Sequence, residues 1–485
     1  INVYSQNSYA MRNDFSGGNV ISNDGTIFIS NSAKGSNVFG GNYSKIINNG
    51  TIQYKPAASN TSGSSGSSGS STTGGTVGDN LNLTINQHVM DTKSPTVSSV
   101  TSSGNEQALN NGTIITETSN TSAMSVETSQ GSAINNNIIT VEANNLKDNG
   151  VNAGMYLSAD TEKSANIVNN GQININTSYS VGMGSASSYN SRIENAENGV
   201  INLNADKTIG LYASGNSNLF NNGTINVNSD DSIAIFSAGT GTWQNSALIS
   251  NSIINVKGKN AIIYQINGST EINQNGRINI DDSVKSTATY YYVNGSLNLK
   301  NIDLGIDSGN FVKIGSKGNG TLTIDKSTSL SISKQGTIIN AENGATLITN
   351  KGILSLPSGS GSYVMLLDKS AKAENYGTIN VNGENNYGVY IKSGEFSNKS
   401  ISTGPEQPTI NVKGNNNYGI FAINDAKITN EGNINVYGND NYGLFSQSSE
   451  DITNSGTITL TGSNNYGIYS VAEGKIINSG SISVQ

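Results

Sequence analysis

Residues 375–381 have the sequence NYGTINV, and residues 386–390 have the sequence NYGVY. Both phrases return later in the chain, as EGNINV at 431–436 with NYGLF at 441–445, and as SGTITL at 455–460 with NYGIY at 465–469. A phrase that recurs in this way indicates that one structural unit is repeated along the chain.

The spacing of the repeated phrase is regular. Tyr442 follows Tyr418 by 24 residues, and Tyr466 follows Tyr442 by another 24. The step from Tyr387 to Tyr418 is 31 residues, because a loop around Pro405 is inserted into the same frame. Self-similarity at a fixed period of this size predicts a solenoid.

Three short strands are expected in each repeat. Gly-Thr-Ile-Asn-Val and Gly-Ile-Tyr-Ser are alternating runs rich in β-branched and aromatic residues, bounded by Asn-Gly and Asn-Asn turns. A third run closes each repeat, as KITN at 427–430, DITN at 451–454 and KIIN at 475–478. Alternation places Ile379 and Val381 toward the interior. We therefore predict an all-β, right-handed parallel β-helix with coils of about 24 residues, three short strands per coil and loop insertions.

The repeat pattern changes along the chain and divides it into four parts. Coils of the β-helix are expected in 1–57, and a Gly/Ser-rich loop or linker in 58–79. An irregular β-helix with insertions follows in 80–370, and regular coils fill 371–485. The strict Gly-Ser-Ser period of 63–71 fits either a natural loop or an engineered splice.

Composition limits the class of protein. Hydrophobic residues make up only 34% of the chain and charged residues 12%, which would fit disorder, but the periodic Ile and Val positions favour folded strands. The absence of cysteine excludes disulfides and thiolate metal sites. A net charge of −8 without a basic cluster argues against nucleic acid or an anionic membrane as partner. No signal peptide or membrane-spanning run is present, and both ends fall within the coil pattern, so we expect a segment of a larger surface protein.

Candidate catalytic groups are few. His88 is the only histidine, so Ser-His-Asp and Cys-His arrangements are not expected. The adjacent Asp pairs Asp230-Asp231 and Asp281-Asp282 follow strands and are expected to be solvated turn carboxylates. No catalytic residue is assigned. The Gly-Gly-x-Gly-x-Asp frame of calcium-binding repeats is missing, so no metal or cofactor is expected.

The second strand of each coil carries an aromatic residue after its aliphatic one. This file contains Tyr212, Phe236, Tyr264, Tyr390, Phe421, Phe445 and Tyr469. With the aliphatic position facing inward, the rings would form a ladder on the outer surface. Such a ladder would either stiffen the coil stack through ring contacts or offer ring faces to sugars or a protein partner. The opposite assignment of faces would bury these rings.

Insertions are further candidates, because loops on a rigid scaffold often carry binding. The three segments are 58–79, Ser237–Ser246 and Gly404–Pro408. Trp243, the only tryptophan, is the best single candidate for a contact residue, although a tryptophan could equally cap a coil.

The pattern Asn-x-Gly-Thr-Ile-x-Val followed by Asn-x-Tyr-Gly-Ile-Tyr-Ser resembles the passenger repeat of type V autotransporter adhesins. The Asn-rich, cysteine-free composition is similar to that of the very large fusobacterial outer-membrane adhesins. The resemblance is strong over 371–485 and weak in the first 150 residues. It implies a virulence-associated cell-surface protein, held in the outer membrane by a C-terminal β-barrel outside this chain. It also implies partners among host-cell glycans, receptor proteins and the surface proteins of coaggregating bacteria.

We therefore expect a non-enzymatic, monomeric, rod-like adhesin segment that binds through its loops or one face. Three alternatives remain open. The segment could be a structural stalk whose adhesive head lies elsewhere, a carbohydrate-active β-helix enzyme with acids that converge in a groove, or a tailspike-like fibre, which would have to trimerise.

Overall fold

The computed structural model is built from β-strands, with no helix in the residues that it describes. It divides into two compact units: unit 1 is Ile1–Ile262 with Asn275–Asp281, and unit 2 is Ile263–Gln274 with Asp282–Gln485. The described residues are 1–3, 9–13, 20–30, 37–41, 45–55, 99–100, 107–117, 122–126, 131–142, 152–157, 165–185, 191–215, 217–239, 253–272, 277–315, 319–400 and 407–485.

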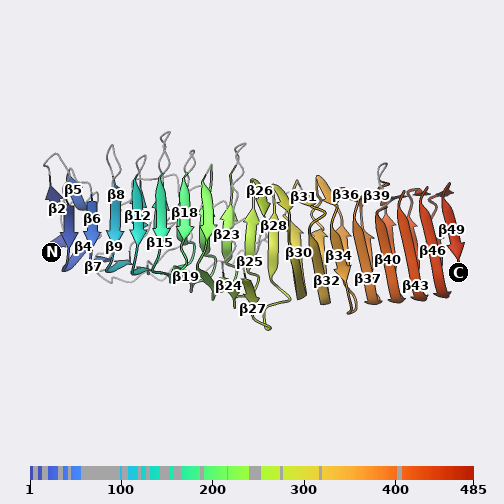
Figure 1. Ribbon diagram of the computed structural model, residues 1–485, viewed down its shortest axis with the longest axis horizontal. Helices are drawn as coiled ribbons and strands as arrows, with labels where there is room; N and C mark the ends of the chain where they lie inside the picture. The colour runs from blue at the N-terminus through green and yellow to red at the C-terminus, as the bar shows by residue number, and fades with distance from the viewer. Residues whose placement is uncertain are drawn as a thin grey trace, which may run out of the picture. The chain divides into compact units, whose positions relative to one another are not determined.

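Unit 1 is a stack of parallel strands in three main sheets (Figure 1). The first sheet contains β1 (Asn2–Val3), β4 (Thr26–Ser30), β7 (Thr51–Lys55), β10 (Thr113–Thr116), β13 (Ile138–Val141), β16 (Gln172–Ile175), β19 (Val200–Leu203), β22 (Thr224–Val227), β24 (Ile253–Val256) and β27 (Arg277–Ile280). The second contains β3 (Val20–Asn23), β6 (Lys45–Asn48), β9 (Gln107–Asn110), β12 (Ser132–Asn135), β15 (Asn166–Asn169), β18 (Arg192–Asn195) and β21 (Asn218–Asn221). The third contains β8 (Ser99–Val100), β11 (Ser122–Val126), β14 (Ala153–Leu157), β17 (Val181–Ser185), β20 (Ile209–Ala213) and β23 (Ile233–Ser237), and β2 (Tyr9–Asn13) pairs with β5 (Asn37–Gly41).

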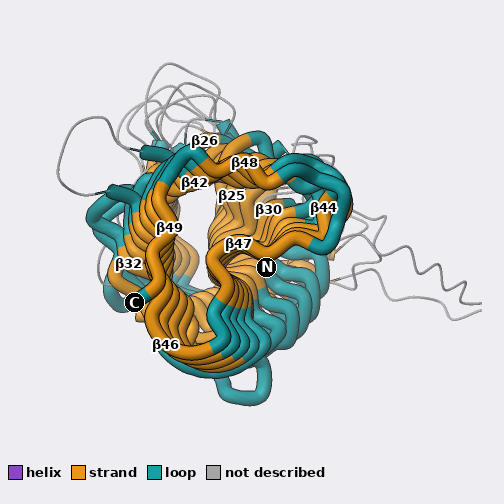
Figure 2. Tube along the Cα trace, turned by 90° about the vertical axis from the view of Figure 1, so that its right-hand side faces the viewer, coloured by secondary structure: helices purple, strands orange, loops and turns teal. Residues whose placement is uncertain are grey.

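Unit 2 continues the same arrangement with longer strands. One sheet contains β26 (Ser269–Ile272), β29 (Ser296–Leu299), β31 (Thr321–Ile324), β33 (Leu347–Asn350), β36 (Ala371–Asn375), β39 (Gly394–Asn398), β42 (Lys427–Asn430), β45 (Ile452–Asn454) and β48 (Ile476–Asn478). The other strands are β25 (Ile262–Ile266), β28 (Thr289–Val293), β30 (Asp303–Ile314), β32 (Ser329–Ala341), β34 (Ile353–Leu356), β35 (Tyr363–Leu367), β37 (Thr378–Glu384), β38 (Tyr387–Ile391), β40 (Thr409–Asn415), β41 (Tyr418–Asn424), β43 (Asn433–Asn439), β44 (Tyr442–Ser448), β46 (Thr457–Ser463), β47 (Tyr466–Ser470) and β49 (Ser481–Val484). Figure 2 shows how β46, β47, β48 and β49 surround the interior of the last coil.

The aliphatic residues of the repeat form the core. Ile379 pairs in register with Ile410, Ile410 with Ile434 and Ile434 with Ile458, and all four side chains are fully buried. Val381 is buried beside them, so the predicted inward positions are confirmed. The predicted fold is confirmed as well: the chain is an all-β parallel solenoid, consistent with a right-handed parallel β-helix.

Buried asparagines mark the end of the third strand in each coil. Their side-chain amides donate to the carbonyl oxygen of the asparagine one coil further on, at 2.7 to 2.9 Å. The ladder of unit 1 is Asn23, Asn48, Asn110, Asn135, Asn169, Asn195 and Asn221; that of unit 2 is Asn350, Asn375, Asn398, Asn430, Asn454 and Asn478. These bonds satisfy polar groups at a buried corner, where an unpaired amide would destabilise the fold.

The Asn pairs before each Tyr-Gly form a second corner. Asn385, Asn416 and Asn464 adopt positive φ angles of 54°, 54° and 56°, a left-handed conformation that asparagine tolerates. The next residue bonds from coil to coil: the Asn386 backbone N–H donates to Asn417 Oδ1 at 2.9 Å. The predicted asparagine turn with contacts between coils is therefore confirmed.

The inserted loop leaves the strand register unchanged. Thr378 pairs with Thr409 and Tyr387 with Tyr418, although each pair is 31 residues apart instead of 24. The Gly/Ser-rich segment 58–79 lies outside the described residues, and the division into irregular and regular coils at 370 stays a prediction. Within the described ranges, the structure contains no helix of the length and apolar character that a membrane span requires.

Candidate functional site

Two files of aromatic rings run side by side across the second strands of unit 2. In β38, Tyr387 and Tyr390 flank Gly388, and their rings meet edge to face with centroids 5.3 Å apart. A Cβ on Gly388 would lie 2.4 Å from the carbonyl oxygen of Gly419, so only glycine permits this approach of neighbouring coils. The files, together called the aromatic strip, are Tyr363, Tyr387, Tyr418, Tyr442 and Tyr466, and Tyr390, Phe421, Phe445 and Tyr469.

Stacking within each file is close and nearly parallel. The rings of Tyr387 and Tyr418 have centroids 5.0 Å apart and planes 5° from parallel. Between the files the contacts are perpendicular, as for Tyr418 and Phe421 at 5.1 Å and 88°. Both arrangements suit the ring quadrupole. Because each ring covers the face of the next, the strip turns ring edges rather than faces toward solvent.

Exposure varies along the strip. Tyr390 and Phe421 are half-buried and Tyr469 is 38% exposed, so the predicted surface position is confirmed for these three, whereas Phe445 is only 9% exposed. Burial raises the pKa of Tyr387 and Tyr442, and neighbouring tyrosines raise it further. The stacked geometry favours the stiffening role over a strip of free ring faces, and the ligand-binding role of these residues stays a prediction.

For two residues of unit 1 the predicted surface position is wrong. Tyr212 is 1% exposed and Phe236 is fully buried, with ring centroids 5.2 Å apart. The physical reason is that both faces of β20 and β23 are covered, since every residue of these strands is buried. Burial accordingly raises the pKa of Tyr212 to about 12. These rings stack, as the ladder predicted, but inside the protein.

Tyr264 is also misplaced by the sequence pattern. It is 2% exposed and stacks at 5.3 Å on Tyr291, which pairs in register with the buried Val312 and through it with Ile339. This file is the inward aliphatic one. Burial raises the pKa of the Tyr264 hydroxyl well above its usual value, and the nearby Tyr290 adds to the rise. The predicted outward position is therefore wrong, because the residue belongs to the interior file.

Two other predicted groups have different outcomes. Trp243 and His88 lie outside the described residues. The Asp pairs occupy turns, as predicted: Asp230 Oδ1 accepts the Lys259 backbone N–H at 2.7 Å, and Asp282 pairs with Lys285 at 2.6 Å. Each Asp pair thus has a structural turn role in the protein.

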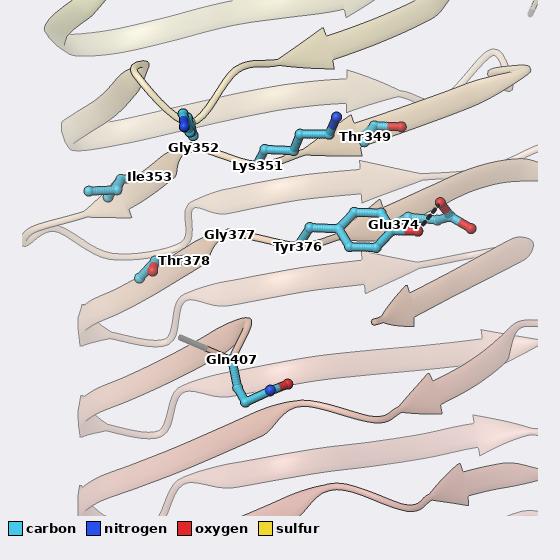
Figure 3. Close-up of a pocket in the computed structure, with 10 residues that line it drawn as sticks. Thr349, Lys351, Gly352, Ile353, Glu374, Tyr376, Gly377, Thr378 and Gln407 are labelled. Carbon is cyan, nitrogen blue, oxygen red and sulfur yellow. Dashed lines mark hydrogen bonds between the residues drawn. The ribbon is translucent and has the colours of Figure 1, made fainter. Parts of the chain in front are cut away.

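A groove that sequence reasoning missed lies at the asparagine corner of unit 2 (Figure 3). Thr349 and Glu374 occupy paired outward positions just before the buried asparagines, and Lys351 and Tyr376 come just after them. The ladder amides fix the backbone here, since Asn350 donates to Asn375 at 2.8 Å. Successive coils therefore place these side chains one above another.

The groove has a volume of about 730 Å³. We call it the Tyr376 groove; its polar and aromatic lining comes from Lys326, Thr349, Lys351, Glu374, Tyr376 and Gln407. Ile353, which is 44% exposed, adds an apolar patch. In Figure 3, Tyr376 lies beside Glu374, with Lys351 and Thr349 one coil away on one side and Gln407 on the other.

Tyr376 and Glu374 form the centre of the groove. The Tyr376 hydroxyl donates to Glu374 Oε2 at 3.0 Å, which holds the ring along the wall. Partial burial raises the pKa of Tyr376, and the bond to Glu374 raises it further. Just beyond, Lys399 pairs with Glu431 at 3.5 Å and the Ser400 hydroxyl bonds Gln407 at 3.2 Å. These contacts hold the rim in place.

The lining is suited to binding. Glu374 is its one carboxylate among the described residues, whereas glycoside hydrolysis uses a pair of carboxyl groups that flank the scissile bond. A ring, two ammonium groups, a hydroxyl and amides instead provide an amphipathic surface for a polar ligand. The sequence did hold a signal, because Tyr376 takes a corner position that Lys351, Lys399 and Glu431 fill in neighbouring coils.

Residues 228–481, more than half of the chain, match the sequence model of a family described as the BigA third pectate lyase-like domain. The chain belongs to this family. The match suggests a bacterial surface protein with a β-helical passenger. The aromatic strip and the Tyr376 groove both lie inside the matched part of this BigA-type domain. A comparison with curated proteins finds no match.

Proposed function

We propose that this BigA-type chain is the adhesive passenger segment of a bacterial surface protein, which attaches to host cells or to other bacteria. The observation that carries the proposal is the Tyr376 groove. It is an amphipathic recess on a closely packed scaffold, where asparagine ladders and stacked rings hold the side chains in place. A preformed recess of this kind lowers the entropy lost on binding.

The protein acts without catalysis in this proposal. Glu374 is engaged with Tyr376 and has no carboxylate partner across the described groove. The passenger repeat resembles that of autotransporter adhesins, so the chain is placed at the outer membrane, held there by an anchoring domain and exposed as a monomer. Its partners are host glycans or receptor proteins and the surface proteins of other bacteria.

Binding of the purified, fluorescently labelled chain to epithelial cells and to partner bacteria tests the proposal. We expect saturable binding that excess unlabelled chain displaces. The control is the same chain denatured in urea and diluted into the assay. A folded sample that binds neither cell type would overturn the adhesive function and assign the segment to a stalk. Light scattering on the same sample checks the monomer against the trimer of a tailspike-like fibre.

A further inference from the structure

The Tyr376 ring differs from every ring of the aromatic strip. No described aromatic residue stacks on it, whereas each strip residue contacts at least one other ring. Its hydroxyl is fixed by Glu374 at 3.0 Å, so the ring has a defined orientation in the groove. A fixed aromatic ring without a ring partner is a platform for the apolar face of a ligand.

Two ammonium groups of the groove are available to a ligand. Lys326 and Lys351 are exposed, and neither forms an ion pair with a described carboxylate. Lysines of the neighbouring coils differ: Lys372 pairs with Glu395 at 3.8 Å and Lys399 with Glu431 at 3.5 Å. Positive charge is thus concentrated at one end of the groove, in a protein whose net charge is −8.

The remaining polar groups suit hydroxyls. Thr349 offers a hydroxyl, Gln407 an amide, and Glu374 has a second carboxylate oxygen beside the one that accepts from Tyr376. The lining crosses four successive coils, or about 14 Å at ~4.8 Å per coil, which leaves room for more than one ring of a chain-like ligand.

We propose that the Tyr376 groove binds an anionic saccharide, with a pyranose face on Tyr376 and the anionic substituent at Lys326 and Lys351. The inference rests on the proposed adhesive function and names the class of ligand. A peptide that adds a strand is less suited, because the strands beside the groove already pair on both sides. A carboxylate and a sulfate ester share this chemistry, and the probes below distinguish them.

Isothermal titration calorimetry on the full chain tests the inference with three tetrasaccharides. Hyaluronan tetrasaccharide carries carboxylates, chondroitin sulfate tetrasaccharide carries carboxylates and sulfates, and chitotetraose is neutral. We expect at least one anionic tetrasaccharide to bind, and chitotetraose to bind about tenfold more weakly or not at all. Binding should weaken as salt rises, because the lysines are exposed.

Variants connect the binding to the groove. We expect Tyr376→Ala to weaken the anionic tetrasaccharide about tenfold and Lys351→Gln about threefold, with a smaller salt dependence for the latter. Tyr437→Ala and Lys413→Gln are matched controls, since both residues are exposed on β40 and β43 outside the groove, and should bind like the wild type. Circular dichroism melting checks that each variant is folded.

Three results would overturn the inference: neither anionic tetrasaccharide binds, chitotetraose binds as tightly as both, or Tyr376→Ala binds like the wild type. The cell assay separates this failure from failure of the adhesive function. If the wild type and Tyr376→Ala adhere to cells equally, the chain is an adhesin that uses another surface. If the wild type does not adhere, the function itself is wrong.

Discussion

The rings of Phe421 and Phe445 lie 4.8 Å apart between centroids and 2° from parallel, although the two residues are 24 positions apart in the sequence. The parallel register of β41 and β44 pairs them directly. The same contact recurs along both files of the strip, so each ring stabilises the coil before it and the coil after it.

Replacing Phe421 with alanine should therefore loosen two coil interfaces. We expect Phe421→Ala to lower the free energy of unfolding by ~2–4 kcal/mol, from lost burial and lost ring contacts. Urea unfolding followed by hydrogen exchange would locate the loss in β38, β41 and β44. Tyr437→Ala, at a position 41% exposed, is the control and should change stability by less than ~0.5 kcal/mol. Equal effects of the two variants would contradict a stabilising role of the strip.

A second prediction concerns the glycine beside the strip. A Cβ on Gly419 would lie 2.6 Å from the carbonyl oxygen of Gly443, whereas a Cβ on Gly25 would meet nothing within 4 Å. We expect Gly419→Ala to destabilise unit 2 by ~1–3 kcal/mol through overpacking, and Gly25→Ala to leave stability within ~1 kcal/mol. Thermal melting of the two variants makes the comparison. A neutral Gly419→Ala would show that neighbouring coils separate more easily than the structure indicates.

The buried asparagine ladder should be more important for stability than the exposed one. Asn430 is fully buried, accepts from Asn398 and donates to Asn454. Asn430→Ala leaves both partners with an unsatisfied group, so we expect a loss of ~1–3 kcal/mol in urea unfolding. Asn411 makes the same kind of bonds at 2.9 and 3.0 Å on the half-buried outer face. There water replaces the lost partner, and Asn411→Ala should have less than half the effect. The reverse order would refute this account of the corner.

Acid should weaken the contact around Asp307. Hydrogen bonds from Lys285, Ser333 and Lys334 hold the pKa of Asp307 below its usual value. The folded-state pKa therefore lies below that of the unfolded chain, so the ionised carboxylate stabilises the fold above about pH 4. This contribution is lost as the pH falls through the folded-state pKa.

Melting curves from pH 7 to pH 2.5 test the role of Asp307. We expect the melting temperature of Asp307→Asn to fall less on acidification than that of the wild type. The difference should shrink in high salt, because the side chain is 40% exposed and its ion pairs are screened. Parallel profiles in the two proteins would exclude a role for Asp307 in acid sensitivity.

Much of the fold was predictable because the repeat is explicit in the sequence. The 24-residue step between Tyr418 and Tyr442 is a strand pairing in the structure, and the inward aliphatic file follows from alternation. The positive φ of Asn385 and Asn416 was predictable from the turn chemistry of asparagine. These features depend on local sequence, which a periodic fold repeats at every coil.

The failures have a physical cause as well. Tyr264 was aligned with Phe236 because both follow an aliphatic residue, and in a strand a shift of one residue reverses the face of every side chain. Burial of Tyr212 depends on what covers the outer face of β20, which alternation within the strand does not reveal. The Tyr376 groove was missed because Asn375-Tyr376-Gly377 has the same letters as Asn386-Tyr387-Gly388 but lies at a different corner.

The coil between Asn398 and Thr409 is longer than its neighbours, yet Thr378 still pairs with Thr409 and Tyr387 with Tyr418. Strand register in unit 2 is therefore set by the interior and not by the number of residues that turn a corner. Evolution can lengthen, shorten or replace such a corner without refolding the coils around it. A lineage could change what antibodies meet at its surface by variation at this one place, while the scaffold beneath stays the same.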